Sequence, residues 1–299
     1  MFETTRQPSG EMSAPPGASA ALPGDCNLQR ASGAGRVVLR GSGSTTEVVD
    51  IYQRFPTRFM FPTIDGGALK EVVVVNAAGG IAGGDRLELE VTALENSLVT
   101  VTSQAAEKIY RALNQPAQVV TKLKARDAGK LAWLPQETII FDSARMRRQM
   151  EIDVRTGTEL MALEWLVLGR TAHGEEVVQG HIHDRWLVRR DGRLVWGDSF
   201  RVAEETFPHL RRRALLTNFN AIGTLLYFGP HLDRRLEMLR EVAQSLACDC
   251  GATLVSGLIV VRFAAKALSD LRIALICMIQ QFGRESDRGP FRVPKMWSC

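Results

Sequence analysis

The segment Asn76-Ala77-Ala78-Gly79-Gly80-Ile81-Ala82-Gly83-Gly84-Asp85 places four glycines within six positions. Glycine tolerates positive φ and lets another segment approach its backbone closely, so a loop this rich in glycine has a shape that other residues cannot adopt. The preceding residues, 71–75, are rich in β-branched side chains, and residues 86–91 alternate polar and apolar side chains. The sequence therefore predicts a strand, a glycine-dependent turn and a second strand.

From the residues alone, this loop has two interpretations. A phosphate-binding loop needs its glycines to open directly into a helix, whose N-terminal amides face the anion. Here the glycines open into the alternating strand 86–91, so a nucleotide-binding protein is the weakest hypothesis. A β-hairpin with a tight turn explains the alternation, but it does not explain two Gly-Gly pairs followed by an aspartate.

Segments of strand length continue on both sides of the loop and are separated by turn formers. They are residues 36–40, 47–53, 98–103, 118–124, 130–134, 149–155, 159–168, 185–190 and 193–196. The last two flank Asp191-Gly192, which predicts a hairpin. So many strands without intervening helices predict a mainly β fold, with a β-sandwich or barrel-like body of many short strands.

Helical periodicity occurs only late in the chain. Leucines recur at helix spacing, opposite charged residues, in two segments that predict C-terminal α-helices near residues 231–247 and 264–280. A buried strand at residues 253–263 is expected between them. Residues 1–35 are rich in Ser, Ala, Pro and Gly and predict a flexible, disordered tail, which leaves residues 36–299 as one β-rich domain.

Charge and cysteine usage argue against several classes of protein. The 299 residues carry a formal net charge of +4, with acidic and basic residues interspersed. The arginine clusters at residues 145–148 and 211–213 have no aromatic residues close by, which argues against nucleic-acid binding and predicts solvated faces or protein contacts. Five cysteines, with no secretory or membrane-spanning segment, predict a reducing, cytoplasmic location.

Four blocks of sequence carry a resemblance to a known family. They are the glycine segment above, Ser103-x-x-Ala106-x-Lys108-x-Tyr110-Arg111, Leu134-Pro135-Gln136-Glu137-Thr138-Ile139-Ile140-Phe141, and Leu168-Gly169-Arg170-Thr171-Ala172-His173-Gly174-Glu175. In this order they are similar to blocks of the urease accessory protein family UreD, also called UreH. A terminal Pro294-Lys295-Met296-Trp297 is weakly similar to the family's ending. Four blocks in order across residues 37–297 make the resemblance specific.

The resemblance implies a urease maturation chaperone that is not itself an enzyme. Such a protein binds nickel-free urease through the urease structural subunits and joins it to UreF and UreG, with GTP hydrolysis assigned to UreG. The absence of a Walker-type lysine loop agrees with that division of labour. No tightly bound cofactor is expected, only transient Ni²⁺, and neither nucleic acid nor a membrane is an expected partner.

Five carboxylates lie in or just after these blocks: Asp85, Glu137, Asp142, Glu175 and Glu176. Acidic residues are seldom buried without a reason. If these side chains converge inside the β body, they would offer weak oxygen ligands along a passage for a divalent ion. The alternative is structural: Asp85 caps its turn, and Glu137 and Asp142 pair with Arg145, Arg147 or Arg170. Both interpretations stay open.

The histidines and cysteines suggest weaker metal sites. His181-Ile182-His183 places two imidazoles on one face of a predicted strand, which suits a metal, although such residues more often face water. An alternative function is therefore a stand-alone metal-binding hydrolase that uses His181 and His183. Cys248-Asp249-Cys250 is too closely spaced for a zinc knuckle. Glu164, mid-strand between apolar residues, is expected on the wet face.

Overall fold

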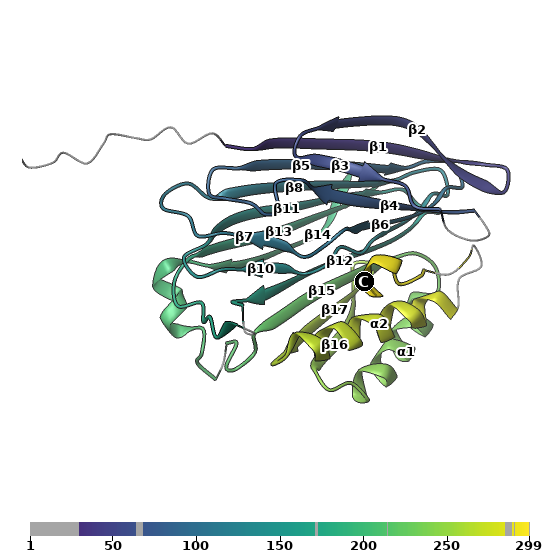
Figure 1. Cartoon of the computed structure of the whole chain (residues 1–299). Helices are drawn as coiled ribbons and strands as arrows, with labels where there is room; N and C mark the ends of the chain where they lie inside the picture. The colour runs from purple at the N-terminus through teal and green to yellow at the C-terminus, as the bar shows by residue number, and fades with distance from the viewer. Residues whose placement is uncertain are drawn as a thin grey trace, which may run out of the picture.

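The computed structural model describes residues 30–63, 68–170, 173–213, 215–284, 289 and 291–298. Residues 1–29 of the proposed disordered tail lie outside the described residues, whereas residues 32–35, which were also assigned to the tail, begin a strand that pairs in a sheet. The described chain is mainly β, as predicted, and forms two large sheets, with two α-helices near the C-terminus (Figure 1).

Sheet A has seven strands in the order β14-β13-β11-β8-β5-β1-β2. Their bounds are β1 (Ser32–Ser42), β2 (Thr45–Arg54), β5 (Arg86–Ala93), β8 (Ala117–Ala125), β11 (Arg145–Val154), β13 (His181–Arg190) and β14 (Arg193–Val202). The five central strands, β13 to β1, run parallel to one another, and the outer strands β14 and β2 pair antiparallel.

Sheet B contains β16-β17-β15-β12-β9-β6-β4-β3, and two short strands, β7 and β10, extend it beside β12. The bounds are β3 (Thr57–Met60), β4 (Leu69–Asn76), β6 (Leu98–Ser103), β7 (Glu107–Ile109), β9 (Lys130–Trp133), β10 (Thr138–Ile140), β12 (Glu159–Leu168), β15 (Ala221–Phe228), β16 (Asp249–Val255) and β17 (Leu258–Ala265). Strands β4, β6, β9 and β12 are parallel, whereas β12, β15, β17 and β16 form antiparallel pairs.

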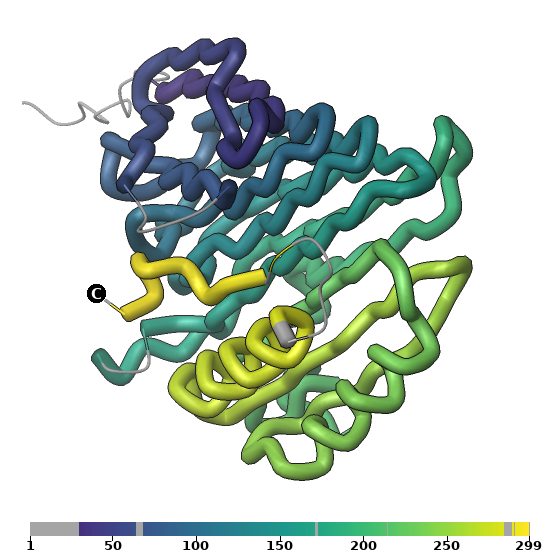
Figure 2. The backbone as a smooth tube through the Cα atoms, turned by 90° about the vertical axis from the view of Figure 1, so that its right-hand side faces the viewer, coloured from purple at the N-terminus to yellow at the C-terminus, as the bar shows by residue number. Residues whose placement is uncertain are grey.

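The chain alternates between the two sheets, so that β5, β8 and β11 of sheet A are each followed by a strand of sheet B. Successive coils stack side by side, from purple at one end to green at the other (Figure 2). This solenoid-like winding replaces the sandwich or barrel predicted from the sequence. A period of two identifies strands with one wet face, but it does not distinguish antiparallel hairpins from parallel coils.

The core between the sheets is built from the inward-facing residues of both. Val91 of β5, Leu123 of β8 and Ile152 of β11 meet Leu131 of β9 and Leu160 of β12 there, all buried. Burying each such side chain stabilises the fold by about 1.5–3 kcal/mol. The predicted hairpin around Asp191-Gly192 is confirmed by the antiparallel pairing of β13 with β14.

Helices α1 (Leu232–Gln244) and α2 (Leu268–Arg284) cover the outer face of sheet B (Figure 1). Both were predicted, with slightly different ends. The buried strand expected at residues 253–263 is instead a hairpin, β16 and β17, that turns at Ser256 and Gly257, both with positive φ. In the described part of the chain, neither helix combines the length and apolar character that a membrane span requires.

Because the helices cover sheet B, strand β12 is buried along its whole length. Next to it on β9, the buried Lys130 pairs with Glu159 at 3.4 Å and donates to the carbonyl of Gly289 at 2.6 Å. The ammonium group also lies 4.0 Å from the centre of the Phe291 ring. The last segment of the chain, which includes the 3-10 helix η3 (Lys295–Ser298), therefore closes over a buried ion pair.

Candidate functional site

The four sequence blocks that carry the family resemblance lie side by side in the structure. Ile81 forms a parallel bridge with Ile109 of β7, β7 pairs with β10, and β10 pairs with β12. Backbone hydrogen bonds continue this ladder, from Phe141 to Ile109 at 3.1 Å and from Gly169 to Ile140 at 2.8 Å. Segments separated by up to about ninety residues in sequence are thus stacked like neighbouring coils along one side of the solenoid.

The glycine turn is shaped to receive Tyr110. Gly79 has a φ of 75°, which favours glycine, and its carbonyl accepts a 3.0 Å hydrogen bond from the Tyr110 hydroxyl. A Cβ atom on Gly80 would lie 2.4 Å from the tyrosine ring. The hairpin interpretation of this turn is wrong, because β4 belongs to sheet B and β5 to sheet A.

A chain of ring and charge contacts continues from this turn to the fourth block. Tyr110 packs edge-on against Phe141, with ring centres 5.2 Å apart, and the Arg170 guanidinium lies 4.4 Å from the centre of the Phe141 ring. Arg170 in turn forms an ion pair with Glu175 at 2.8 Å. Each block therefore contributes one member of a single contact chain, which gives a physical reason for the four blocks to occur together.

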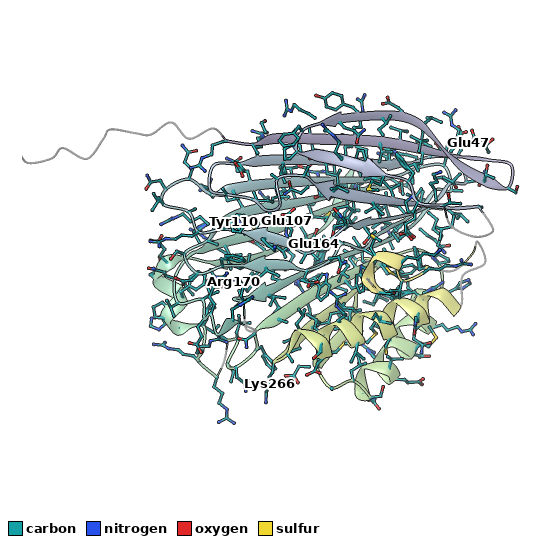
Figure 3. The ribbon with its side chains drawn as sticks, viewed as in Figure 1. Glu47, Glu107, Tyr110, Glu164, Arg170 and Lys266 are labelled. Atoms are coloured by element: carbon teal, nitrogen blue, oxygen red, sulfur yellow. The ribbon has the colours of Figure 1, made fainter. Side chains whose placement is uncertain are left out.

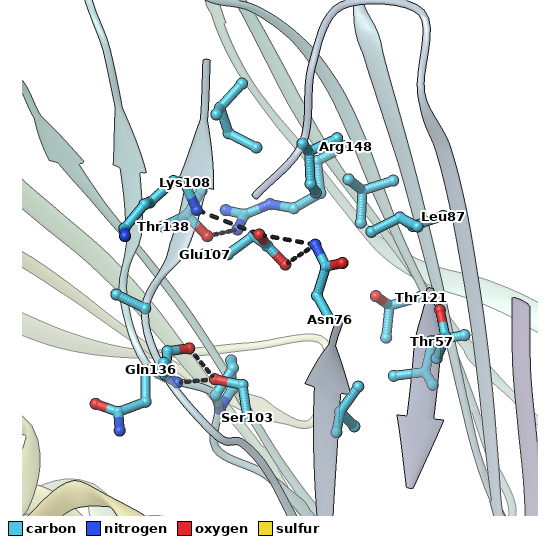
Figure 4. A pocket seen from close by; sticks show the side chains of 18 of the residues that line it. Thr57, Asn76, Leu87, Ser103, Glu107, Lys108, Thr121, Gln136, Thr138 and Arg148 are labelled. Atoms are coloured by element: carbon cyan, nitrogen blue, oxygen red, sulfur yellow. Dashed lines mark hydrogen bonds between the residues drawn. The ribbon is translucent and has the colours of Figure 1, made fainter. Parts of the chain in front are cut away.

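Beside this stack, a pocket of about 360 Å³ opens between the two sheets (Figure 4). Its polar lining includes Asn76, Ser103, Glu107, Arg148 and Glu164. A volume of this size falls in the range of small-ligand sites. The pocket combines an apolar wall with a few polar groups that face one another.

Glu107 is the carboxylate on the glycine-loop side of this pocket (Figure 4). Asn76 donates to both of its oxygens at 3.1 Å, and the backbone amide of Lys108 donates at 3.2 Å. Burial raises the pKa of Glu107 from 4.5 to about 7, although these hydrogen bonds act in the opposite direction. The group therefore exchanges a proton near neutral pH and can present either a carboxylate or a neutral acid to the pocket.

Deeper between the sheets, Arg148 joins two carboxylates. Its Nε and Nη2 atoms donate to Asp184 at 3.0 and 2.6 Å, and Nη1 donates to Thr138 at 3.1 Å and to Glu164. Trp133 Nε1 donates to the other Glu164 oxygen at 2.9 Å. Burial raises the pKa of the Glu164 carboxyl, and the positive charge of Arg148 opposes the rise. Two acids share one guanidinium in a site shielded from water.

Two expectations fail at this network. Glu164, labelled in Figure 3, was expected on a wet face, but it is only 6% exposed, because its face of β12 points between the sheets. Arg148 was assigned to a solvated arginine cluster, yet it is 5% exposed and faces inward. Periodicity misled here, because a charged residue at a period-two position was assumed to mark the solvent side.

Two of the predicted carboxylates, Asp85 and Glu137, lie apart from this network. Asp85 accepts hydrogen bonds from the amides of Ala31 and Ala82, each at 2.8 Å, as in the turn-capping alternative. Glu137 pairs at 2.7 Å with Arg272 of α2 and thus ties the third block to the helical layer. The predicted arginine partners of Glu137 came from residues 145–170, whereas the observed partner lies more than a hundred residues away.

Asp142 and Glu175 are brought together. The Asp142 amide donates to Glu175 at 3.4 Å, and the Asp142 carboxylate accepts from the amides of Val178 and Gln179 at 2.9 and 3.1 Å. These hydrogen bonds outweigh burial and lower the pKa of Asp142, whereas the Arg170 guanidinium lowers the pKa of Glu175. Glu176, the fifth predicted residue, is exposed to solvent.

His181 and His183 lie on the outer face of β13 among Arg147, Arg185 and Arg201. Such a surrounding disfavours a metal cation, because like charges repel. Cys248 is buried and Cys250 half-buried, and both are free thiols whose pKa is raised by burial. Within the described ranges, no three His, Cys, Asp or Glu residues converge in a way that could hold a metal ion.

Sequence reasoning missed Glu107, Asp184 and the inward position of Arg148. Glu107 lies inside the second block, directly before Lys108. Asp184 shares the inward side of its strand with Ile182 and Trp186, both buried. An acid flanked at two-residue spacing by apolar side chains was therefore the available signal for a buried ion pair.

Comparisons with known proteins agree with the four blocks. A family model described as UreD urease accessory protein matches residues 31–298. A protein from Xanthobacter autotrophicus named urease accessory protein UreD is 36% identical over 270 residues, covering 90% of this chain and 91% of its own length. A protein of the same name from Rhizobium johnstonii is 37% identical over 271 residues, covering 90% and 96%. The chain therefore belongs to the UreD urease accessory protein family.

Proposed function

We propose that this chain is a urease maturation factor that binds nickel-free urease and, together with UreF and UreG, passes Ni²⁺ toward the urease active site. Family membership supports the maturation role. The chain acts by binding and positioning rather than by catalysis. Its place of action is the cytoplasm, where its thiols stay reduced.

The observation that carries the nickel route is the pocket between the sheets. Its polar atoms are mostly oxygen donors and amides, which hold a divalent transition metal more weakly than thiolates or clustered imidazoles do. Glu107 lies on one side of the pocket, and the ion-paired Arg148 and Glu164 line it further in. An ion carrier needs ligands that release their cargo, and this lining offers such ligands.

The predicted carboxylates extend this proposal outside the pocket. Asp142 and Glu175 form one pair of acids near the Arg170 contact chain, and Glu137 lies at the junction with α2. We include them, with Asp85 and Glu176, as weak transit ligands outside the pocket. Each is already engaged by amides or an arginine, except Glu176, so an ion would have to share these oxygens.

The test is the nickel content of urease matured in cells that carry this chain, UreF, UreG and urease. Glu107→Gln keeps the size of the side chain and one accepting oxygen but removes its charge. We expect urease with less bound nickel, while the variant still co-purifies with UreF and urease. Glu47→Gln, an exposed change on β2, is the matched control and is expected to leave nickel content unchanged.

A second set of variants separates the pocket from the carboxylates outside it. Glu137→Gln and Glu175→Gln are compared with Glu107→Gln in the same cells. A loss of nickel only in Glu137→Gln and Glu175→Gln would move the route out of the pocket. Unchanged nickel in all three variants would remove the conduit and leave the role of joining proteins.

A further inference from the structure

The outer face of sheet A carries a hollow of about 490 Å³ that the nickel proposal does not use. It spans four neighbouring strands, β8, β11, β13 and β14. Its outward-facing lining consists mainly of hydrogen-bond donors: Gln118, Arg147, Gln149, His181, His183, Arg185 and Arg201.

The strand register places two of these arginines and a histidine in one row. Arg147 of β11 is aligned with His183 of β13, and His183 is aligned with Arg201 of β14. With strands about 4.8 Å apart, the two arginine backbones lie roughly 10 Å from each other. Two arginine side chains can span that distance and reach one small anion above the histidine.

The next row adds further donors. Arg185 stands two residues along β13 and is aligned with Ser199 of β14, whose hydroxyl lies 3.1 Å from Nε2 of His183. His181 stands two residues in the other direction on the same face. Burial first, and then the charges of Arg147 and Arg201, lower the pKa of His181, as expected at a site of positive potential.

Several other cations on this face are paired. Arg36 pairs with Asp50, Lys124 with Glu90, and Arg126 with Asp153. Within the residues that the structure describes, Arg147, Arg185 and Arg201 form no salt bridge. Nearby carboxylates are already engaged: Glu88 pairs with Arg86 and Glu204 with Arg145, and Glu151 accepts a hydrogen bond from Gln149.

We propose that this hollow, defined by Arg147, His183, Arg185 and Arg201, binds a phosphoryl oxyanion, either free or as part of a phosphorylated small molecule. Like charges placed side by side across strands destabilise a sheet, so a row of them needs a compensating partner. The planar guanidinium fork matches the oxygens of a phosphoryl group in pairs. Histidine and serine complete a set of donors around such a group.

The size of the hollow favours a small anion over an acidic protein segment. Its volume lies within the range of small-ligand sites, whereas a stable protein contact buries about 800 Å² on each partner. The row formed by Arg147, His183 and Arg201 is also only three strands wide. The hollow opens on the other side of sheet A from the interior pocket, because β11 and β13 send their Arg148 and Asp184 side chains to the inner face; Val119, Val120 and Arg148 contribute to the lining of both.

The experiment measures anion binding to the full chain by titration calorimetry at low salt. The probes are inorganic phosphate, pyrophosphate and a nucleoside diphosphate, which distinguish a free anion from a phosphorylated molecule. We expect saturable binding of at least one probe. The Arg147→Ala/Arg201→Ala double variant is expected to lose affinity by roughly tenfold or more, because each charged hydrogen bond contributes strongly.

Arg193→Ala is the matched control. Arg193 is an exposed arginine on the same strand as Arg201, about 25 Å away along β14. Its substitution also removes the positive charge of a guanidinium group. It should bind the probes like the unaltered chain. If circular dichroism shows that the double variant is poorly folded, Arg201→Lys replaces it. Lysine keeps the positive charge but cannot form the two parallel hydrogen bonds of a guanidinium, so this variant tests those bonds alone.

Three results would overturn the proposal. One is the absence of saturable binding for all three probes. Another is an equal loss of affinity in Arg193→Ala and in the double variant, which would indicate net charge rather than a site. The third is selective binding of a glutamate-rich peptide with no binding of phosphate compounds, which would make this face a protein-docking surface.

Discussion

Arg147 and Arg148 are consecutive residues of β11, and the pleat of the strand sends their side chains to opposite faces of sheet A. Inside, Arg148 meets Glu164, Asp184 and Thr138 and has partners for all three of its nitrogens. Outside, Arg147 stands beside other cations. The difference shows that arginine serves two purposes one position apart: the inner one neutralises buried acids, and the outer one keeps its charge available.

This comparison also separates stability from binding. A buried charge must be paired, and removal of its partner leaves an uncompensated ion in a medium of low polarity. An exposed charge is hydrated whether or not it is paired, so its loss costs little. The inner arginine is therefore expected to govern folding, and the outer one to govern what the surface attracts.

The largest effect is expected from Arg148→Ala. Glu164 and Asp184 then remain buried without a cation, so the free energy of unfolding is expected to fall by about 3–5 kcal/mol. Arg147→Ala, the neighbouring change, should stay within about 0.5 kcal/mol. Urea denaturation of both variants measures this difference. Similar losses in the free energy of unfolding of the two variants would contradict the distinction between the inner and the outer arginine.

An intermediate effect is expected from Glu107→Gln, and it depends on pH. The folded chain holds this proton up to a pKa of about 7, whereas the unfolded chain releases it near 4.5. The stabilisation from Glu107 is therefore complete below pH 4.5 and is lost as the pH rises through 7. The variant has no such loss.

The measurement compares urea denaturation of the unaltered chain and of Glu107→Gln at pH 4.5 and pH 8. Relative to the variant, the unaltered chain is expected to lose about 1–2 kcal/mol over this interval, less than the full pKa shift would give, because the side chain is partly exposed. Glu47→Gln, an exposed glutamate, should show no comparable pH dependence. If the difference in unfolding free energy between the unaltered chain and Glu107→Gln stays constant with pH, the raised pKa of Glu107 is contradicted.

The smallest effect is expected from the Arg147→Ala/Arg201→Ala double variant. Removal of two cations from one row relieves repulsion, so the free energy of unfolding is expected to be unchanged or to rise by about 0.5 kcal/mol. Added NaCl screens that repulsion and should stabilise the unaltered chain more than the variant. Thermal unfolding at low and high salt tests this, and a clear loss of stability would mean that the row is held together by contacts of its own.

Local features of the fold could be predicted from the sequence. The Asp191-Gly192 turn, the strands at residues 86–91 and 98–103, and both C-terminal helices follow from short-range patterns, and the structure confirms them. Strand β15 (Ala221–Phe228) was missed, although its eight residues are nearly all apolar. Such a short apolar run carries no period, because both of its faces are buried.

The arrangement of the strands could not be predicted in the same way. Whether β5 pairs with β4 or with β8 depends on contacts between distant segments, and alternation within one strand carries no information about its neighbours. The candidate site shows the same limit. The four blocks carried the family resemblance, but the pairing of Glu164 with Arg148, sixteen positions apart and on different sheets, follows only from the fold.

The closure of the last segment over Lys130 has a consequence for the order of events during synthesis. Each coil of the solenoid bonds mainly to the coil before it, so the strands can assemble as the chain leaves the ribosome. Lys130 and its partner Gly289 are 159 positions apart. At translation rates of about 5–20 residues per second, Gly289 is therefore synthesised roughly 8–30 s after Lys130. During that interval the nascent chain presents an apolar sheet that the finished molecule hides, and this is the stage at which a folding helper has most to bind.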